Sequence, residues 1–498
     1  MGILIHPTSF YSPYGVGDLG DEAHAFIDIA YENKIRLWQV LPLGPTGYGD
    51  SPYASRSTFA GNELLIDLKA LYLEGYLELE DIMISDSDID SDRVDYGAVR
   101  KLKFPLLRKA AKAFLKGAAK DEGYQKFLES EKWWLSDYAL YQVLCDKFND
   151  SRWFSSWPLD LKNRVPSALE RERVENAEEI EIWKALQYFF RKQWLSLKEY
   201  ANERDIRIIG DIPIFVAPDS VDAWTNRNLL KIDEDGNQEV SSGVPPDAFS
   251  STGQLWGNPL YRWSEHEKTG FAWWISRIRE TLRLCDIIRI DHFRGLSACW
   301  EVPSGEETAI NGKWVKSPGK ELLSAVREAL GSKLPIIAED LGVITEDVVE
   351  LRDSFSLPGM KILQFAFSRN EDGEFDADNA YLPHNIGRNS VVYTGTHDNN
   401  TSVGWYQSLS DGDKDLVRRY FECPDDQAVW QMIRHAMMSN AKYAIIPMQD
   451  LLMLGEEARM NTPSTCGSSN WSWKMRKGEI SSPNWSRIHY LTKLYGRC

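Results

Sequence analysis

The sequence lacks any apolar run long enough to cross a lipid bilayer. A membrane-spanning helix needs about 20 consecutive, mostly apolar residues, and no stretch of these 498 residues approaches that length. The opening residues, MGILIHPTSFYSPYG, also lack the charged segment followed by an apolar core that marks a secretory signal peptide. We therefore expect a cytoplasmic protein with no membrane partner.

Cysteine and histidine patterns typical of metal centres are missing as well. The six cysteines are scattered along the chain without a CxxC pair, which argues against a zinc knuckle or a disulfide framework and favours reduced thiols. No HExxH motif occurs. Residues 15–20, GVGDLG, match the glycine spacing of a dinucleotide fingerprint, but the preceding FYSPY contains Pro13 and does not predict a strand. We expect no metal and no cofactor.

Positive charge is scarce. The formal net charge is -17 and the sequence pI is about 5.1, so the field of the protein repels phosphate backbones and nucleic acid is not expected as a partner. Tryptophan, by contrast, is abundant, with 19 residues. A surplus of indole rings suits a cleft that binds sugars, because pyranose C–H faces pack on aromatic rings. The pairs Trp133-Trp134 and Trp273-Trp274 lie in helical patterns, where we expect them to pack in the core.

Short, nearly continuous apolar runs recur between longer amphipathic stretches. Such runs are typical of strands buried on both faces, as in a parallel sheet. Strand–helix alternation on this scale predicts an α/β fold, a (β/α)8 TIM barrel with large insertions that takes in residues 1–498 as a single catalytic domain. The predicted strands lie in the runs 36–43, 206–216, 286–294, 335–342, 360–367, 391–398 and 443–449.

Two long stretches interrupt this alternation. Residues 69–205 are largely helical in pattern and rich in Lys and Glu, so we expect a mainly helical inserted subdomain there. Residues 217–285 contain a hairpin signal, LLKIDEDGNQEV, with its turn at Asp235-Gly236, followed by the loop GVPPDAFSSTGQLWGNP. Because the loops after strand ends build the sites of barrels, we expect a second inserted subdomain here, whose loop contributes to the site.

Four of the predicted strands deliver an acidic residue close to their carboxyl end. An acid in a buried strand is costly unless it is paired or functional, and the carboxyl ends of barrel strands meet on one rim. For a single acid, an ion pair inside the barrel is an equally good explanation; for the set of four it is the weaker one. The four acids are Asp211, Asp291, Glu339 and Asp398.

The surroundings of two of these acids indicate different roles. Arg289 and Asp291 share one face of their strand, because side chains alternate along a strand. Arg289 can therefore hold Asp291 ionised and oriented, as a carboxylate nucleophile requires. Glu339 follows the apolar residues 336–338, a setting that favours a raised pKa and a general-acid role.

An ordered set of motifs, running from near the first residue to about residue 473, resembles that of the 4-α-glucanotransferases (amylomaltases or disproportionating enzymes) of glycoside hydrolase family 77. The resemblance implies transfer of a segment of a 1,4-α-D-glucan to the 4-hydroxyl of an acceptor by a retaining double displacement. Maltooligosaccharides or other α-1,4-glucans would serve as donor and acceptor. The matching motifs are HPTSFYSPYGVGDLG, LWQVLPLGPTGYGDSPYASRSTFAGN, GDIPIFV, GVPPDAFSSTGQLWGNPLYRW, RIDHFRG, IIAEDLG, TGTHDNNT and NTPSTCGSSNWSW.

The resemblance also implies roles for individual residues. Asp291 matches the nucleophile, Glu339 the acid and base, and Asp398 the carboxylate that grips ring hydroxyls. Arg289 matches the partner that positions the nucleophile, and His397 resembles another donor to the same ring. The remaining matches line the sugar subsites: Tyr53, as a stacking platform, and Asp211 on the donor side, Asp247 and Trp256 on the acceptor side, and Asn461 and Asn470 in a loop on the opposite lip.

Two other functions stay open at this point. An α-glucan hydrolase on a related barrel would use the same two-carboxylate chemistry, and a glucan-binding protein with a degenerate site would keep the fold alone. The intact trio of Asp291, Glu339 and Asp398 argues against the second. Conversion of maltotriose into longer maltooligosaccharides plus glucose would separate a transferase from a hydrolase. The sequence does not indicate an oligomeric state.

Overall fold

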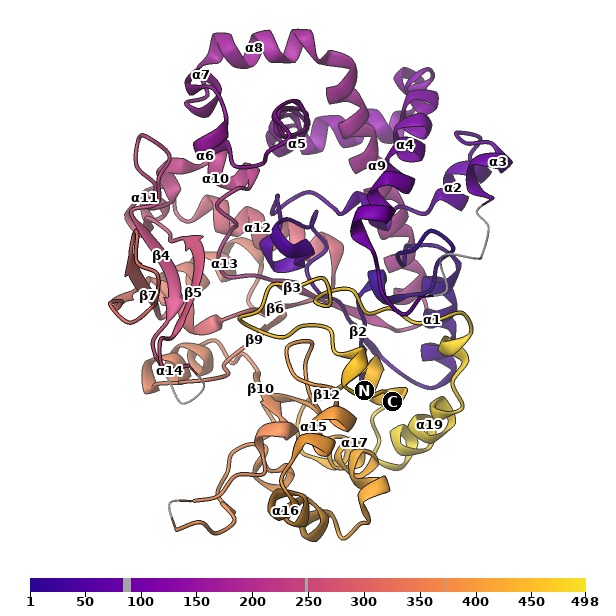
Figure 1. The fold of residues 1–498 in the computed structure, drawn as a ribbon, viewed down its shortest axis with the longest axis vertical. Helices are drawn as coiled ribbons and strands as arrows, with labels where there is room; N and C mark the ends of the chain where they lie inside the picture. The colour runs from indigo at the N-terminus through magenta and orange to yellow at the C-terminus, as the bar shows by residue number, and fades with distance from the viewer. Residues whose placement is uncertain (84–90, 247–249, 371) are drawn as a thin grey trace.

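The structure, a computed structural model, describes residues 1–83, 91–246, 250–370 and 372–498. Its centre is a closed barrel of parallel strands (Figure 1). Neighbouring strands pair in parallel, and the barrel closes where the last strand pairs with the first. In order around the barrel, the strands are β1 (Gly2–Leu4), β2 (Leu37–Gln39), β3 (Arg207–Ile212), β6 (Ile287–Ile290), β9 (Ile336–Ala338), β10 (Gly359–Ile362), β11 (Ser390–Tyr393) and β12 (Tyr443–Pro447).

The predicted (β/α)8 barrel is confirmed, and the seven apolar runs that predicted strands each contain or overlap one. Nearly all strand residues are buried, which explains why the runs are apolar throughout rather than alternating. The first strand, β1, was not predicted, because its sequence GIL is too short to stand out as a run.

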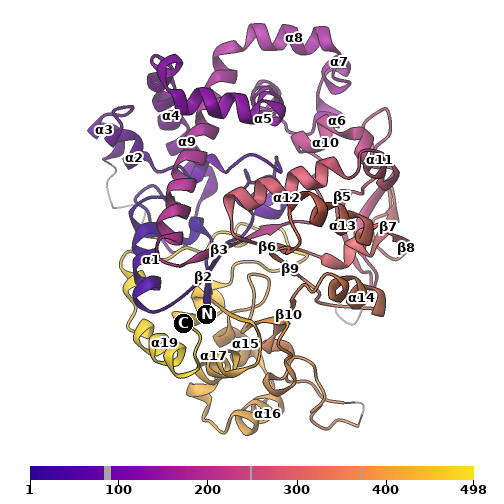
Figure 2. The same ribbon diagram turned by 180° about the vertical axis from the view of Figure 1, so that it is seen from behind.

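Helices surround the barrel and cover the outer faces of its strands (Figures 1 and 2). They lie between consecutive strands or after the last one, as the parallel connections of a barrel require. These helices are α1 (Asp21–Glu32), α12 (Ala272–Leu284), α13 (Gly319–Leu330), α14 (Glu346–Ser354), α15 (Ser402–Ser408), α16 (Asp411–Phe421), α17 (Ala428–Met438), α18 (Met448–Leu451) and α19 (Asn484–Leu494).

The connection from β2 to β3 forms a helical insertion that rises from one end of the barrel, at the top of both ribbon views (Figures 1 and 2). None of the described helices, the 27-residue α5 included, combines the length and the apolarity that a bilayer crossing requires. The helices of this insertion are α2 (Leu68–Leu73), α3 (Leu79–Ile82), α4 (Tyr96–Leu115), α5 (Glu122–Phe148), α6 (Trp153–Ser156), α7 (Leu159–Lys162), α8 (Pro166–Glu175) and α9 (Ala177–Asn202).

A buried ion network ties this insertion to the barrel wall. Glu131 on α5 accepts a hydrogen bond from Arg283 on α12 over 2.8 Å and lies 3.6 Å from Arg191 on α9. Glu280 on α12 pairs with the same two arginines. Removing one partner would leave a buried charge unpaired, which is costly. The network therefore favours the observed position of the insertion against the barrel.

The connection from β3 to β6 holds α10 (Val221–Thr225), β4 (Val240–Val244), β5 (Gln254–Pro259) and α11 (Trp263–Lys268). Strands β4 and β5 join β7 (Ala298–Pro303) and β8 (Lys313–Lys316), which follow β6, in one antiparallel sheet of order β5-β4-β7-β8. The connection from β3 to β6 and the segment after β6 therefore form one subdomain together. The turn expected at Asp235-Gly236 is present, with Gly236 at φ 83 and its N–H donating to the carbonyl of Asp233 over 3.1 Å.

Candidate active site

Two acidic residues lie side by side at the rim of the barrel. Strands β6 and β9 are neighbours, and their last residues, Ile290 and Ala338, are register partners. Asp291 and Glu339 are the next residue on each strand. The N–H of Glu339 donates to the carbonyl of Ile290 over 3.1 Å, which carries the pairing one step further. Since neighbouring strands lie about 5 Å apart, the backbones of Asp291 and Glu339 start from adjacent points on the rim.

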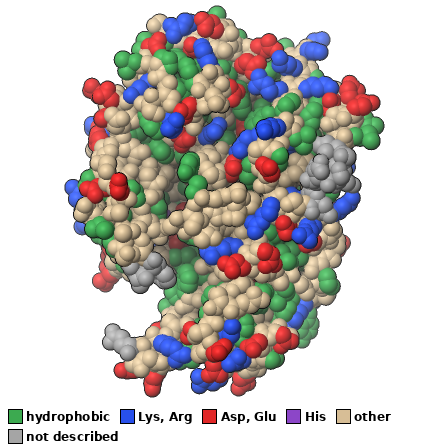
Figure 3. All heavy atoms as spheres, viewed as in Figure 1, with side chains coloured by type: hydrophobic (Ala, Val, Ile, Leu, Met, Phe, Trp, Pro, Cys, Tyr) green, Lys and Arg blue, Asp and Glu red, His purple; other side chains and the backbone are tan. Residues whose placement is uncertain are grey.

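A deep cleft opens above this rim, and the space-filling view shows the surface indented on this face (Figure 3). Its volume is about 1320 Å³, which is large enough for several sugar units. The cleft is lined by eight of the predicted site residues: Tyr53, Trp256, Arg289, Asp291, Glu339, His397, Asp398 and Asn461. The sequence therefore identified side chains from distant parts of the chain that the fold brings to one cavity.

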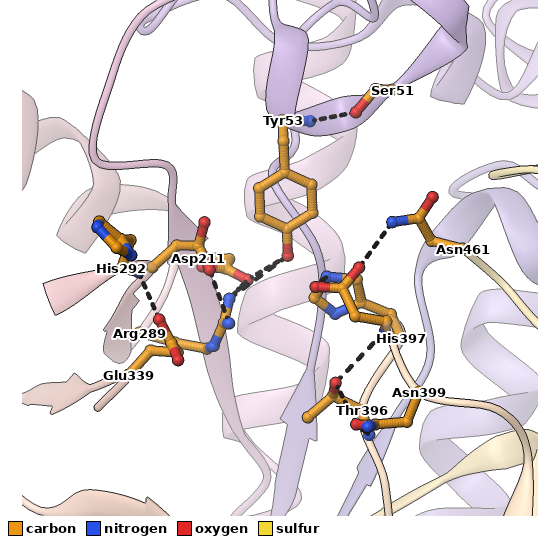
Figure 4. A network of polar contacts seen from close by, with 12 residues as sticks. Ser51, Tyr53, Asp211, Arg289, His292, Glu339, Thr396, His397, Asn399 and Asn461 are labelled. Atoms are coloured by element: carbon orange, nitrogen blue, oxygen red, sulfur yellow. Dashed lines mark hydrogen bonds and ion pairs between the residues drawn. The ribbon is translucent and has the colours of Figure 1, made fainter. Parts of the chain in front are cut away.

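Arg289 holds the nucleophile candidate. Its guanidinium donates to Asp291 over 2.8 Å and to Asp211 over 2.5 Å. The hydroxyl of Tyr53 donates to the same oxygen of Asp211 over 2.7 Å, so its ring points down toward this cluster (Figure 4). Burial lowers the pKa of Arg289, but Asp211 and Asp291 together outweigh it and raise that pKa well above its ordinary value. The guanidinium thus stays charged beside Asp291.

Glu339 is held by the backbone and is almost completely buried. One carboxyl oxygen accepts from the N–H of His292 over 2.6 Å (Figure 4). The other accepts from the N–H of Leu341 over 3.0 Å. Burial, reinforced by the negative charge of Asp291, raises the pKa of Glu339 to about 8. The two N–H donors oppose this shift without cancelling it. Glu339 therefore carries a proton at neutral pH, as a general acid must.

His292 connects Glu339 to the outer wall of the cleft. It adopts a left-handed backbone conformation, with φ 48, which aims its N–H at the Glu339 carboxyl group. Its ring stands edge-on to the indole of Trp256, with centroids 4.7 Å apart. Burial lowers the pKa of His292 to about 4, so its imidazole is neutral at neutral pH.

Asp398 lies in the loop that follows β11, on the other side of the cleft. Its carboxylate accepts from the side-chain amide of Asn461 over 2.7 Å and lies 3.4 Å from Nε2 of His397. Arg459 donates to its backbone carbonyl over 2.8 Å. The ring of His397 stacks on Tyr53, with centroids 5.0 Å apart. His397 and the loop that carries Arg459 and Asn461 therefore fix Asp398, while part of its carboxylate faces the cleft.

Two other predicted site residues lie elsewhere. Asp211 sits behind the cleft wall, buried beneath Tyr53 and Arg289, where it acts on other protein groups. Asn470 is buried within its own loop: its amide accepts from the N–H of Thr462 and donates to the carbonyl of Thr465, both over 3.1 Å. Asp247 lies outside the described residues.

Other residues of the cleft were missed at the sequence level. The segment after β10 contributes Gln364, Phe365 and Phe367, and Tyr381 follows from the next loop. The run 360–367 predicted a strand, but without an acid at its end it gave no sign of a site. The pattern LQFAF, in which aromatic residues extend beyond the strand end, was the available signal.

No cluster of three or more His, Cys, Asp or Glu side chains in the described part of the chain is arranged to hold a metal ion. Asp211 and Asp291 instead share one cationic partner, Arg289.

Comparisons with known proteins agree with this geometry. A family model described as 4-α-glucanotransferase, glycoside hydrolase family 77, matches residues 5–480. A 4-α-glucanotransferase of Thermus thermophilus is 46% identical over 502 residues, covering 99% of this chain and 98% of that one. A chloroplastic/amyloplastic 4-α-glucanotransferase of Arabidopsis thaliana is 44% identical over 505 residues, covering 100% of this chain and 85% of its own length.

A solved structure is similar over the whole chain as well. The amylomaltase of Streptococcus agalactiae, determined in complex with acarbose, superposes with a TM-score of 0.95 at 39% identity and covers 99% of both chains. Sequence, fold and the arrangement of the rim acids thus point the same way, and this chain belongs to the 4-α-glucanotransferases of glycoside hydrolase family 77.

Proposed function

We propose that this protein cleaves an α-1,4 bond of a glucan, retains the donor segment on Asp291, and transfers it to the 4-hydroxyl of glucose or another glucan. One observation supports these roles above all. Asp291 and Glu339 follow paired strands, yet their surroundings differ: the Arg289 guanidinium donates a hydrogen bond to Asp291, whereas burial raises the pKa of Glu339 to about 8. A retaining mechanism needs that difference, because one carboxylate attacks while the other donates a proton.

The reaction then runs in two displacements. Glu339 gives its proton to the glycosidic oxygen, the C1–O bond breaks, and Asp291 forms an ester with C1 of the donor sugar. After the leaving segment departs, the ionised Glu339 removes the proton of the acceptor 4-hydroxyl. That oxygen attacks C1 and releases Asp291, so two inversions retain the α configuration.

Asp398 and His397 bind the hydroxyls of the sugar that reacts. The amide of Asn461 holds one oxygen of Asp398, which leaves the rest of its carboxylate to accept from ring hydroxyls. Such contacts accelerate the reaction where they strengthen as the ring flattens toward an oxocarbenium ion. Tyr53 orients this side of the site, because its hydroxyl bonds Asp211 and its ring supports His397.

Transfer outcompetes hydrolysis when an acceptor displaces water from the covalent intermediate. Trp256 lines the cleft beside His292, close to the group that must activate the acceptor. We assign it to the acceptor side, together with Asp247 of the GVPPDAF motif. Asn470 supports the opposite lip by holding its loop in shape.

Incubation with maltotriose tests the function directly. A transferase produces glucose and a ladder of longer maltooligosaccharides while the number of reducing ends stays constant, since each bond broken is replaced by a bond formed. An α-glucan hydrolase would instead raise the number of reducing ends with every cleavage. The Asp291→Ala variant is the control and should be inactive. Turnover of maltotriose by this variant at the parental rate would refute the assignment of the nucleophile.

We also propose that the protein works in the cytoplasm. All six cysteines are free, and three of them, Cys145, Cys285 and Cys299, are buried. Free thiols of this kind are typical of a reducing compartment. Fractionation of the source cells with an antibody against the chain tests this assignment.

A further inference from the structure

A second cavity lies apart from the active-site cleft, between the helical insertion and the barrel wall. Its volume is about 320 Å³, and it shares none of its lining residues with the cleft. Helices α5, α10 and α12 contribute to it, together with the segment around Phe59. Its lining residues are Ser57, Phe59, Trp133, Trp134, Asp137, Val221, Asp222, Thr225, Asn226, Ala272, Trp273 and Ser276. We call it the Trp133 pocket.

Aromatic rings form the floor of this pocket. Phe59 lies at their centre, with ring centroids 4.6 Å from Trp133, 6.3 Å from Trp273 and 6.4 Å from Trp134. Trp134 is buried, as the sequence predicted, but the expectation that Trp133 packs in the core is wrong: 48% of it is exposed. It faces outward from α5 because its neighbours on that helix take the buried positions. An indole left half in water beside a cavity is a surface that a ligand can cover.

Polar groups border the aromatic floor. The Asp222 carboxylate accepts from the N–H of Thr58 over 2.7 Å, and Asp137 pairs with Arg164 over 2.8 Å. The indole N–H of Trp273 is buried and has no hydrogen-bond partner among the described residues. Hydroxyl and amide groups come from neighbouring lining residues. Asp137 is already paired with Arg164, and Asp222, whose pKa burial raises to about 6, offers the pocket a carboxyl group that can accept hydrogen bonds from hydroxyl groups.

This combination fits a neutral sugar better than an ion or an apolar molecule. A pyranose ring has apolar C–H faces that pack on indole rings and hydroxyl edges that exchange hydrogen bonds with carboxylates, amides and indole N–H groups. The volume lies at the lower end of the range of about 300–1,000 Å³ that is usual for ligand pockets. One or two glucosyl units of a longer chain would fill it.

One chain segment links the pocket to the active site. Tyr53 lines the cleft and Phe59 lines the pocket, six positions further along the sequence. Even fully extended, that segment spans only about 20 Å. A glucan held in the pocket therefore stays within a short reach of the cleft, which raises the local concentration of further segments of the same chain there.

We propose that the Trp133 pocket is a second carbohydrate-binding site, which holds glucosyl units of a long α-glucan while another segment, or another chain, reacts in the cleft. This inference rests on the proposed function, because it takes the substrate of the cleft as the ligand of the pocket. It also predicts that the pocket acts only on substrates long enough to leave units outside the cleft.

Steady-state kinetics of Trp133→Ala on a short and a long substrate test the proposal. Loss of the stacking surface should raise KM for long-chain amylose by roughly 2- to 10-fold, while kcat and KM for maltotriose stay at parental values. Trp133→Phe keeps an aromatic face and should recover part of the loss. Tyr490→Ala removes a ring that is also largely exposed, on α19. This control should leave kcat and KM unchanged for both substrates.

Electrophoresis through a native gel that contains amylose measures binding without turnover. In an Asp291→Asn background, Trp133→Ala should migrate faster than its parent through the amylose gel and equally fast through a gel without amylose. Circular dichroism and thermal unfolding establish that each variant is folded.

The outcomes separate the two proposals. If the parent disproportionates maltotriose but Trp133→Ala leaves both the amylose KM and the gel retention unchanged, the second site does not exist and the proposed function stands. An equal loss of kcat/KM for maltotriose and for amylose would also overturn the second site, because it would show that Trp133 supports the fold or the cleft. If the parent fails to disproportionate maltotriose, the proposed function itself fails, whatever the variants do.

Discussion

Arg289 Nη2 lies 2.8 Å from Asp291 Oδ1, which joins a buried guanidinium to a carboxylate that reaches the cleft. The other terminal nitrogen of Arg289 is held by Asp211, which is itself held by Tyr53. A chain of polar contacts therefore runs from a loop of the N-terminal region to the proposed nucleophile. Because each member is fixed by the next, small changes away from Asp291 should alter its reactivity.

Arg289→Lys should lower kcat/KM for maltotriose by roughly 10- to 100-fold, because a lysine keeps the charge but cannot donate to both carboxylates in the same geometry. The measurement is initial-rate kinetics with the parent and the variant side by side. Arg279→Lys, on the exposed face of α12, is the matched control and should behave as the parent. Parental kcat/KM in Arg289→Lys would contradict a positioning role for the guanidinium.

Tyr53→Phe should lower kcat/KM by about 10-fold, since it removes one donor from the buried Asp211 carboxylate and keeps the ring that supports His397. Tyr53→Ala should lower kcat/KM further, because it removes the ring as well. If Tyr53→Phe matches the parent while Tyr53→Ala is impaired, the ring alone matters and the hydrogen bond to Asp211 has no part in catalysis.

The pH dependence of kcat/KM should report the proton on Glu339. A raised pKa means that the protonated acid is present at neutral pH and is lost as the pH rises through about 8. We therefore expect kcat/KM to fall above about pH 8, approaching tenfold per pH unit. A profile that stays flat to pH 10 would show that another group supplies the proton.

Glu339→Gln should lower kcat for maltotriose by roughly 10²- to 10⁴-fold, because the amide cannot protonate the leaving oxygen. An α-maltosyl fluoride donor needs no such proton, since fluoride leaves unaided, so the first displacement should recover. Azide added as a nucleophile that needs no base should then yield the α-glycosyl azide, detected by mass spectrometry and NMR. A β-glycosyl azide, or no rescue at all, would argue against the double displacement.

Trp256→Ala should raise the ratio of hydrolysis to transfer. The indole covers the cleft beside His292, whose N–H holds Glu339, so its loss opens a path for water to the covalent intermediate. The ratio is measured as new reducing ends per glucose released during maltotriose turnover. Trp314→Ala, a comparably exposed indole on β8 outside the cleft lining, provides the control. An unchanged ratio in Trp256→Ala would remove this residue from the acceptor site.

The barrel and the rim acids could be predicted from the amino-acid sequence alone. Buried parallel strands leave continuous apolar runs, and an acid that ends such a run is conspicuous because burial penalises it. Asp291 and Glu339 could be assigned different roles from immediate neighbours alone, since Arg289 shares the strand face of one and apolar residues precede the other. Where the local pattern was faint, as in the three residues of β1, the prediction missed the element.

Which side chains face the cleft and which support it could not be predicted before the packing of the elements was known. Tyr53 and Asp211 lie 158 positions apart, and no local pattern shows that the hydroxyl of one binds the carboxylate of the other. The same holds for Asn470, whose amide closes its own loop, and for Trp133, which a helical pattern placed in the core but the packing of α5 leaves half exposed. Periodicity and spacing record how a residue sits on its own element, whereas these contacts depend on how distant elements pack against one another.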